Sequence, residues 1–262
     1  MILLSGAAFS VAPLAQATSV WVILRLLGAR APFGLAMAVW GHGYVLRYAP
    51  SGALAVVYRV RARDRLSATR EQILAAEAYE HLGSLTAGAC ACLAAFAAAG
   101  GLPPVLALAV TVPTIATAIA VRPRFLGGWA KRYLARFGLD VPILRGRHLL
   151  IAIGLNLVAW LATGAGFLVL LNGLTDKSSP GLLGAIAIYT VGYLVGFIVP
   201  FLPGGLGARE GALVAALATR YGAGAATGVG LATRAAATLG EVIAVGLIWV
   251  CFYGRRAILH AR

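Results

Sequence analysis

The sequence predicts an all-α integral membrane protein with about five transmembrane helices and two re-entrant helical hairpins in an inverted-topology repeat. Of its 262 residues, 61% are hydrophobic and only 11% are charged, against roughly 25% charged residues in soluble domains. Five apolar stretches approach or exceed the roughly 20 residues that span the hydrocarbon core of a bilayer. Two further apolar stretches are interrupted by Pro/Gly turns, a pattern that marks the binding site in transporters built from repeats.

The predicted spans cover residues 2–24, 73–100, 102–121, 148–173 and 224–253. Pro13 and Gln16 interrupt the first of these runs. The stretches 33–58 and 182–219 contain the two turns, so each fits a hairpin that enters and leaves the membrane on one side. Before the second span, Ser67 or Thr69 is the candidate N-cap, and Thr69 and Gln72 have the spacing of a capping box, which predicts a helix start there.

The net charge of +14 is explained by the distribution of basic residues in a membrane protein rather than by nucleic-acid binding. Most of them lie in four loop clusters, at 25–30, 59–70, 122–147 and 255–262. With five spans and two hairpins, all four clusters fall on one side, which we take as cytoplasmic. We therefore expect a protein of the cell membrane with a cytoplasmic C-terminus and no nucleic-acid partner.

The order of spans and hairpins indicates one membrane domain, 1–262, built from two repeats. Repeat one covers about 1–121, a basic cytoplasmic loop covers 122–147, and repeat two covers about 148–254. The two hairpins are entered from opposite sides. From Pro50 to Glu80 is 30 residues and from Pro203 to Arg234 is 31, so opposite charges occupy nearly equivalent positions.

The hairpin tips are the first candidate site. A broken backbone at membrane depth persists only where protein or a wet cavity surrounds it. The residues expected to shape the tips are Tyr48, Pro50, Ser51 and Gly52 in the first hairpin and Pro203, Gly204, Gly205 and Gly207 in the second.

Three arginines lie inside apolar segments, namely Arg47, Arg209 and Arg234. Charges there are costly and usually face a partner or a cavity. Guanidinium groups suit phosphate, and the glycines before Arg209 leave backbone N–H groups exposed next to a helix N-terminus. We expect these arginines to form a binding site for a lipid phosphate.

Acidic groups and histidines accompany the arginines as charge partners or lining. Glu77, Glu80 and Ser84 share one helical face, and the full set is His42, Glu77, Glu80, His81, Glu210 and Glu241. An alternative is that these groups only hold the repeats together, through a pair between Glu80 and Arg234 and a pair of Arg209 with Glu210 or Glu241. Both roles can coexist if a lipid headgroup exchanges with the glutamates.

Neither catalysis nor a bound cofactor is predicted. The sequence has no HExxH motif and no P-loop, and we expect no catalytic residue, no metal and no cofactor. Three cysteines, Cys90, Cys92 and Cys251, lie in predicted spans, and their odd number gives no disulfide framework.

These motifs resemble those of a known family. The run from Pro203 to Gly211, followed by Arg234, is similar to the signature of the lysylphosphatidylglycerol synthase transmembrane-region family, which includes the flippase domain of multiple peptide resistance factor proteins and stand-alone relatives. The turn from Tyr48 to Gly52, with Glu80 downstream, resembles its first re-entrant motif, with Ser51 where a glycine is common. The resemblance runs from about Leu24 onward. It implies a flippase and not a synthase, because aminoacyl transfer belongs to a separate soluble domain and only nine residues follow Tyr253.

We therefore expect a flippase that moves an anionic, phosphate-bearing lipid between leaflets, either a polyprenyl-phosphate-linked sugar or a phospholipid, modified or not. The alternatives are a membrane scaffold whose buried ion pairs are structural, and a lipid-modifying enzyme that uses Glu80 and His81. The expected partners are membrane lipids and the anionic lipid substrate. A homo-oligomer and a partner glycosyltransferase or lipid synthase remain open.

Overall fold

The fold is helical throughout the part of the chain that the structure, a computed structural model, describes. These residues are 1–46, 48, 53–99, 135–136, 140, 142–176, 178–198 and 207–252. The helices are α1 (Ile2–Leu26), α2 (Phe33–Leu46), α3 (Ala53–Arg61), α4 (Arg70–Ala99), α8 (Gly146–Leu174), α9 (Gly181–Ile198), α10 (Ala208–Tyr221) and α11 (Ala223–Phe252).

Three of these helices are long and apolar enough to cross a membrane, over Ile2–Leu26, Arg147–Leu174 and Ala223–Phe252. The chain is therefore a helical membrane protein. The first span runs unbroken through Pro13. α4, which covers most of the predicted span 73–100, is not one of the three. It has the same 30-residue length as α11, but its first half carries several ionisable groups. The predicted span 102–121 and most of the basic loop 122–147 lie outside the described residues.

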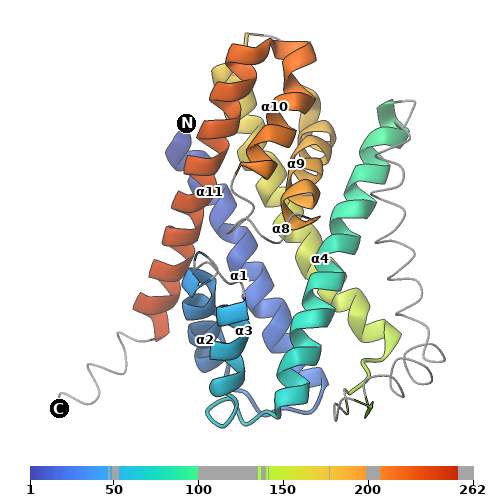
Figure 1. Cartoon of the computed structure of the whole chain (residues 1–262), viewed down its shortest axis with the longest axis vertical. Helices are drawn as coiled ribbons and strands as arrows, with labels where there is room; N and C mark the ends of the chain where they lie inside the picture. The colour runs from blue at the N-terminus through green and yellow to red at the C-terminus, as the bar shows by residue number, and fades with distance from the viewer. Residues whose placement is uncertain are drawn as a thin grey trace.

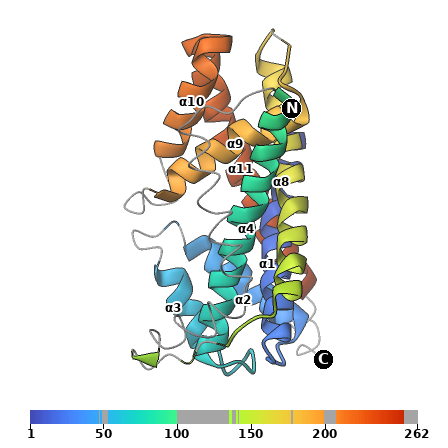
Figure 2. The same cartoon turned by 90° about the vertical axis from the view of Figure 1, so that its right-hand side faces the viewer.

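Four helices, α1, α4, α8 and α11, run along the long axis of the molecule (Figure 1). The shorter helices occupy its two ends: α2 and α3 lie at one end and α9 and α10 at the other, in both views (Figure 2). The helix ends that flank the basic clusters at 25–30, 59–70 and 145–147 all lie at the end that holds α2 and α3. That agreement is the one expected from the charge distribution along the sequence.

The helix–helix contacts of the first half of the chain correspond to those of the second half. If α1 is exchanged with α8, α2 with α9, α3 with α10 and α4 with α11, each main helix–helix contact maps onto another that is present. For example, α1 packs on α11 as α8 packs on α4, and α4 packs on α9 as α11 packs on α2. The contact between α1 and α8 maps onto itself. The two halves of the chain thus have the same neighbour relations.

Small residues bring the long helices close together, as is common where helices pack in membranes. A Cβ atom added at Gly240 of α11 would lie 2.8 Å from the backbone oxygen of Gly6 on α1. On another face of α1, the Ser5 hydroxyl donates to the backbone oxygen of Gly166 on α8 at 2.9 Å. α1 is therefore fixed between α8 and α11.

The predicted start of α4 is confirmed. The Gln72 side-chain oxygen accepts from the Thr69 backbone N–H at 2.8 Å, and the Gln72 N–H donates to the Thr69 hydroxyl at 3.2 Å. This reciprocal pair is the capping box expected from the sequence.

Candidate functional site

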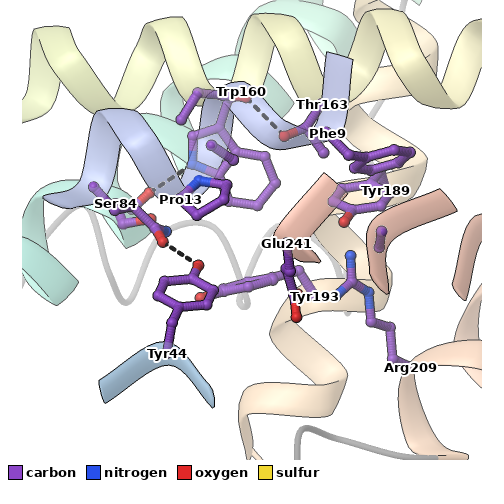
Figure 3. Close-up of a pocket in the computed structure, with 14 residues that line it drawn as sticks. Phe9, Pro13, Tyr44, Ser84, Trp160, Thr163, Tyr189, Tyr193, Arg209 and Glu241 are labelled. Atoms are coloured by element: carbon purple, nitrogen blue, oxygen red, sulfur yellow. Dashed lines mark hydrogen bonds between the residues drawn. The ribbon is translucent and has the colours of Figure 1, made fainter. Parts of the chain in front are cut away.

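A central cavity of about 60 Å³ lies between the two ends of the bundle, where both sets of helices meet. Figure 3 shows Arg209 and Glu241 on one side of it, with Tyr44 and Tyr193 nearby and Trp160 across. Its lining comes from α1, α2, α4, α8, α9, α10 and α11, through Phe9, Ala12, Pro13, Gln16, Tyr44, Ser84, Ala159, Trp160, Thr163, Tyr189, Tyr193, Arg209, Ala237 and Glu241. Most of the described helices therefore contribute to one wall or another.

Arg209 enters this cavity from the first turn of α10. Its guanidinium carbon lies 4.4 Å from the ring centroid of Tyr189 and 5.7 Å from that of Tyr193, both on α9. These distances are in the range of cation–π attraction, which is stronger where water is excluded. The tyrosines, one turn apart on α9, thus hold the cation against the cavity wall.

The start of α10 is set by glycine and glutamate. Gly207 precedes the helix with φ +83° and ψ −47°, a conformation that residues with a side chain rarely adopt. Its backbone N–H donates to the Glu210 carboxylate at 2.7 Å. Since Arg209 follows two residues after Gly207, this turn determines where the guanidinium points.

A second arginine, Arg234 of α11, is joined to the same region by a chain of polar contacts. Its guanidinium lies 3.6 Å from the Glu210 carboxylate and 5.8 Å from the ring centroid of Tyr48. The Tyr48 hydroxyl in turn donates to the Glu241 carboxylate, which lines the central cavity. Residues of the first tip, α10 and α11 therefore form one polar network.

An apolar groove of about 420 Å³ adjoins this network between α2 and α11. Tyr44 and Glu241 line both the groove and the central cavity. The rest of its wall is mostly aliphatic and aromatic, formed by Val45, Tyr48, Thr238, Val242, Val245, Gly246 and Trp249. A polar cavity and an apolar groove thus share two residues.

A third cavity, of about 170 Å³, lies between α2, α3 and α4. In it Arg59 of α3 pairs with Glu77 of α4 at 2.6 Å, and both side chains are 8% exposed. The Arg59 guanidinium also stacks 3.4 Å from the ring centroid of Trp40. Glu80 is buried beside this pair, and its carboxylate lies 3.2 Å from a ring nitrogen of His81.

Several residues predicted for the site take places that the sequence did not indicate. Glu80 contacts His81, and Arg234 faces Glu210, so the pair between Glu80 and Arg234 that was considered as an alternative is not formed. His42 is exposed on α2, where it contacts its own helix at Ala38 and the ring of Tyr58. The predicted site residues that lie outside the described part of the chain are Arg47, Pro50, Ser51, Gly52, Pro203, Gly204 and Gly205.

Within the predicted basic cluster 59–70, Arg59 differs from its neighbours, because it is buried while Arg61, Arg63 and Arg65 are exposed. A hint in the sequence was that Arg59 follows directly on the apolar run 53–58.

The sequence also missed much of the cavity wall. Gln16, Tyr44, Tyr189 and Tyr193 line the central cavity. The signal for Gln16 was present, since a polar residue within an apolar span usually faces the protein interior. The tyrosines carried no such signal, because aromatic residues are equally at home in a helix core.

Fold and site together define a polytopic helical membrane protein with a charged cavity enclosed between two sets of helices. The chain belongs to the family described as Lysylphosphatidylglycerol synthase TM region, which it matches over residues 1–246. The resemblance stated from the motifs is thereby confirmed. The family's description connects the chain with membrane lipids. No curated protein gives a significant match to the chain.

Proposed function

We propose that this protein is a lipid flippase that moves an anionic, phosphate-bearing lipid between leaflets through the central cavity. The observation that carries the proposal is the shared wall between two chemically different spaces. Glu241 and Tyr44 border both the polar cavity, which contains Arg209, and the apolar groove. An amphipathic molecule can place its headgroup in the first space and a hydrocarbon chain in the second.

Phosphate recognition falls to Arg209 and Arg234, with Arg47 as a third candidate on the first hairpin. A guanidinium group stays charged at any relevant pH and matches phosphate oxygens with paired N–H donors. In the structure, Arg234 is paired with Glu210 at 3.6 Å. A lipid phosphate would replace this carboxylate, so the pair holds the arginine in position until the substrate arrives.

The headgroup requires the cavity to open. At roughly 15 Å³ for each enclosed water, the 60 Å³ space accommodates about four water molecules. A sugar phosphate or an esterified glycerol phosphate is larger. We propose that the cavity widens to admit it.

The topology is part of the same proposal. We propose that α2 with α3 and α9 with α10 are re-entrant hairpins of two inverted repeats within a single membrane domain. The exchange of helix contacts between the halves supports the repeat, and the opposite placement of the helix pairs supports the inversion. The basic clusters favour a cell-membrane protein with a cytoplasmic C-terminus.

Within this class, a polyprenyl-phosphate-linked sugar is our preferred substrate and a phospholipid, modified or not, is the second choice. A glycosyltransferase or lipid synthase would then supply the lipid. A scaffold role is favoured by one observation, the pairing of Arg234 with Glu210, which could serve only to join α10 to α11. We propose no catalytic step.

Leaflet exchange in reconstituted liposomes tests the proposal. Fluorescent lipids with and without a phosphate group are compared for the wild type, Arg209→Ala and Arg234→Ala, and exchange is measured by quenching of the outer leaflet. We expect the wild type to exchange phosphate-bearing lipids faster than lipids without phosphate. In both variants the rate of exchange of phosphate-bearing lipids should fall at least 10-fold, equivalent to about 1.4 kcal/mol.

Two further variants separate recognition from folding. Arg220→Ala removes an exposed arginine at the far end of α10, which donates to Ser178, and should keep most of the activity. Arg234→Lys keeps the charge but loses the paired donors, so it should impair a phosphate site and spare a scaffold. The flippase proposal is overturned if the well-folded wild type exchanges none of the lipids.

A further inference from the structure

The cavity between α2, α3 and α4 has a charge balance that the lipid site does not explain. Glu77 and Glu80 both line it and are 6% and 4% exposed. They are neighbours on one face of α4, three residues apart. Arg59 compensates one of these two carboxylates through its 2.6 Å contact with Glu77. The charge partner that the described residues offer Glu80 is the His81 ring at 3.2 Å, which carries a charge only when it is protonated.

The hydrogen bonds of the cavity show the same surplus. Glu80 Oε1 and Glu77 Oε2 are fully buried, and neither has a hydrogen-bond partner among the residues that the structure describes. Buried polar atoms are nearly always paired, and an ionised carboxylate without compensation is especially costly. Arg59 Nε, a donor, is buried and unpaired in the same 170 Å³ cavity, so one donor faces two unpaired carboxylate oxygens, and this excess of acceptors favours a cation there.

Within the described part of the chain, several helices besides α4 contribute polar groups to the wall around Glu80. α3 contributes Arg59, which is already paired with Glu77. α2 and α9 contribute Tyr44 and Tyr193, and α1 contributes Gln16, which is uncharged. On its own helix, Glu80 faces Glu77 and His81, and α8 carries no charged residue between His148 and its end. His81 is 49% exposed, so it connects the carboxylate with the surroundings.

We propose that this cavity is a binding site for a monovalent cation, a proton or a sodium ion, held by Glu80 together with Glu77. Both ions neutralise the surplus charge, and both are coupling ions of transporters with intramembrane sites. A small cation suits the site because carboxylate oxygens can hold it directly, and Glu80 and Glu77 each present one unpaired buried oxygen.

The position of the site suggests what the cation does. Gln16, Tyr44 and Tyr193 line both this cavity and the central one. The Tyr44 hydroxyl donates to the Gln16 side chain at 2.5 Å, so this contact lies in the wall between them. A cation that moves with a singly charged lipid phosphate makes the transfer electroneutral. This coupling rests on the proposed flippase function, whereas cation binding does not.

Thermal unfolding of the purified full-length chain tests binding without reference to transport. Melting temperatures are measured in sodium chloride and in choline chloride at equal ionic strength, and across pH 5 to 8 in choline. For the wild type we expect a rise of about 3 °C or more with sodium or with acidification. A response to sodium at fixed pH identifies a sodium site, and a response to pH alone identifies a proton site.

Two variants assign the response to the cavity. Glu80→Gln keeps the shape and removes the surplus charge, so it should fold well and lose most of the wild-type response. Asp64→Asn is the control, because Asp64 is 87% exposed and should keep the full response. The proposal is overturned if the wild type responds to neither ion, if Glu80→Gln responds like the wild type, or if Glu80→Gln cannot fold in choline at neutral pH.

Coupling is measured afterwards in the liposome assay with an inward gradient of the ion identified. We expect the gradient to accelerate lipid exchange by the wild type at least threefold and to leave Glu80→Gln unaccelerated. If the wild type exchanges lipids at the same rate with and without the gradient, the proposed coupling is wrong and the flippase proposal stands. If unfolding shows the ion and no lipid is exchanged, the flippase proposal fails and the cation site stands.

Discussion

Gly207 is the residue whose replacement gives the sharpest test of the α10 start. Its positive φ is unfavourable for any residue with a Cβ atom, by about 1–2 kcal/mol. A Cβ atom there would meet nothing within 4 Å, so strain and not crowding decides the outcome. We expect Gly207→Ala to lower the melting temperature and to slow lipid exchange, because Arg209 and Glu210 follow this turn.

Gly211, four residues further on, provides a matched comparison. It lies within α10, and a Cβ atom there would also meet nothing within 4 Å. Since alanine is favoured over glycine inside a helix by roughly 0.5–1 kcal/mol, Gly211→Ala should be neutral or stabilising. Equal melting temperatures for the two variants would contradict the role assigned to Gly207.

The burial of Arg59 could not be predicted from the sequence around it. Its neighbours in the chain are exposed basic residues, and by position it belonged with them. Its burial results from the packing of α3 against α4 and Trp40, which no local pattern encodes. The arginines inside apolar runs were easier to single out, because a charged residue within a membrane segment is costly and therefore stands out in the sequence. Which carboxylate each arginine meets still depended on the tertiary arrangement.

The positions of whole helices were predicted more reliably than the contacts and cavities between them. Apolar length located α1, α8 and α11, the Thr69/Gln72 box located the start of α4, and the Pro/Gly turns separated α2 from α3 and α9 from α10. These features depend on local chemistry. The cavities do not, because their walls combine residues from helices far apart in the sequence, as with Tyr44 and Glu241.

The crossing of α1 and α11 depends on Gly240. A Cβ atom at this position would lie 2.8 Å from backbone atoms of both Gly6 and Phe9, which cannot rotate away. Gly240→Ala should therefore separate the helices and lower stability by about 1–3 kcal/mol. The change is measured by heating the protein in detergent and recording the loss of folded, non-aggregated protein.

Gly246, less than two turns along the same helix, is the control for this crossing. A Cβ atom there would meet nothing within 4 Å. Gly246→Ala should gain up to about 1 kcal/mol from helix propensity. The prediction about the crossing is refuted if Gly240→Ala melts as late as Gly246→Ala.

At the level of the entire bundle, the two ends should face different compartments. Asp64 follows shortly after α3, and Asp176 lies in the connection between α8 and α9. Figure 1 shows α3 at one end of the molecule and α9 at the other. In a variant without the three native cysteines, single cysteines at these positions can be labelled with an impermeant maleimide on intact cells. We expect labelling of Asp176→Cys and none of Asp64→Cys until the membrane is opened. Labelling of both from outside would exclude the topology.

The paired contacts of the two halves also bear on how such a molecule could change shape. Each half keeps the same set of neighbours although the two differ in residues and in the cavities they enclose. If the two halves exchanged their arrangements, the same set of helix–helix contacts would still describe the molecule. We therefore expect a change of shape to alter the geometry of existing contacts and to create no new ones.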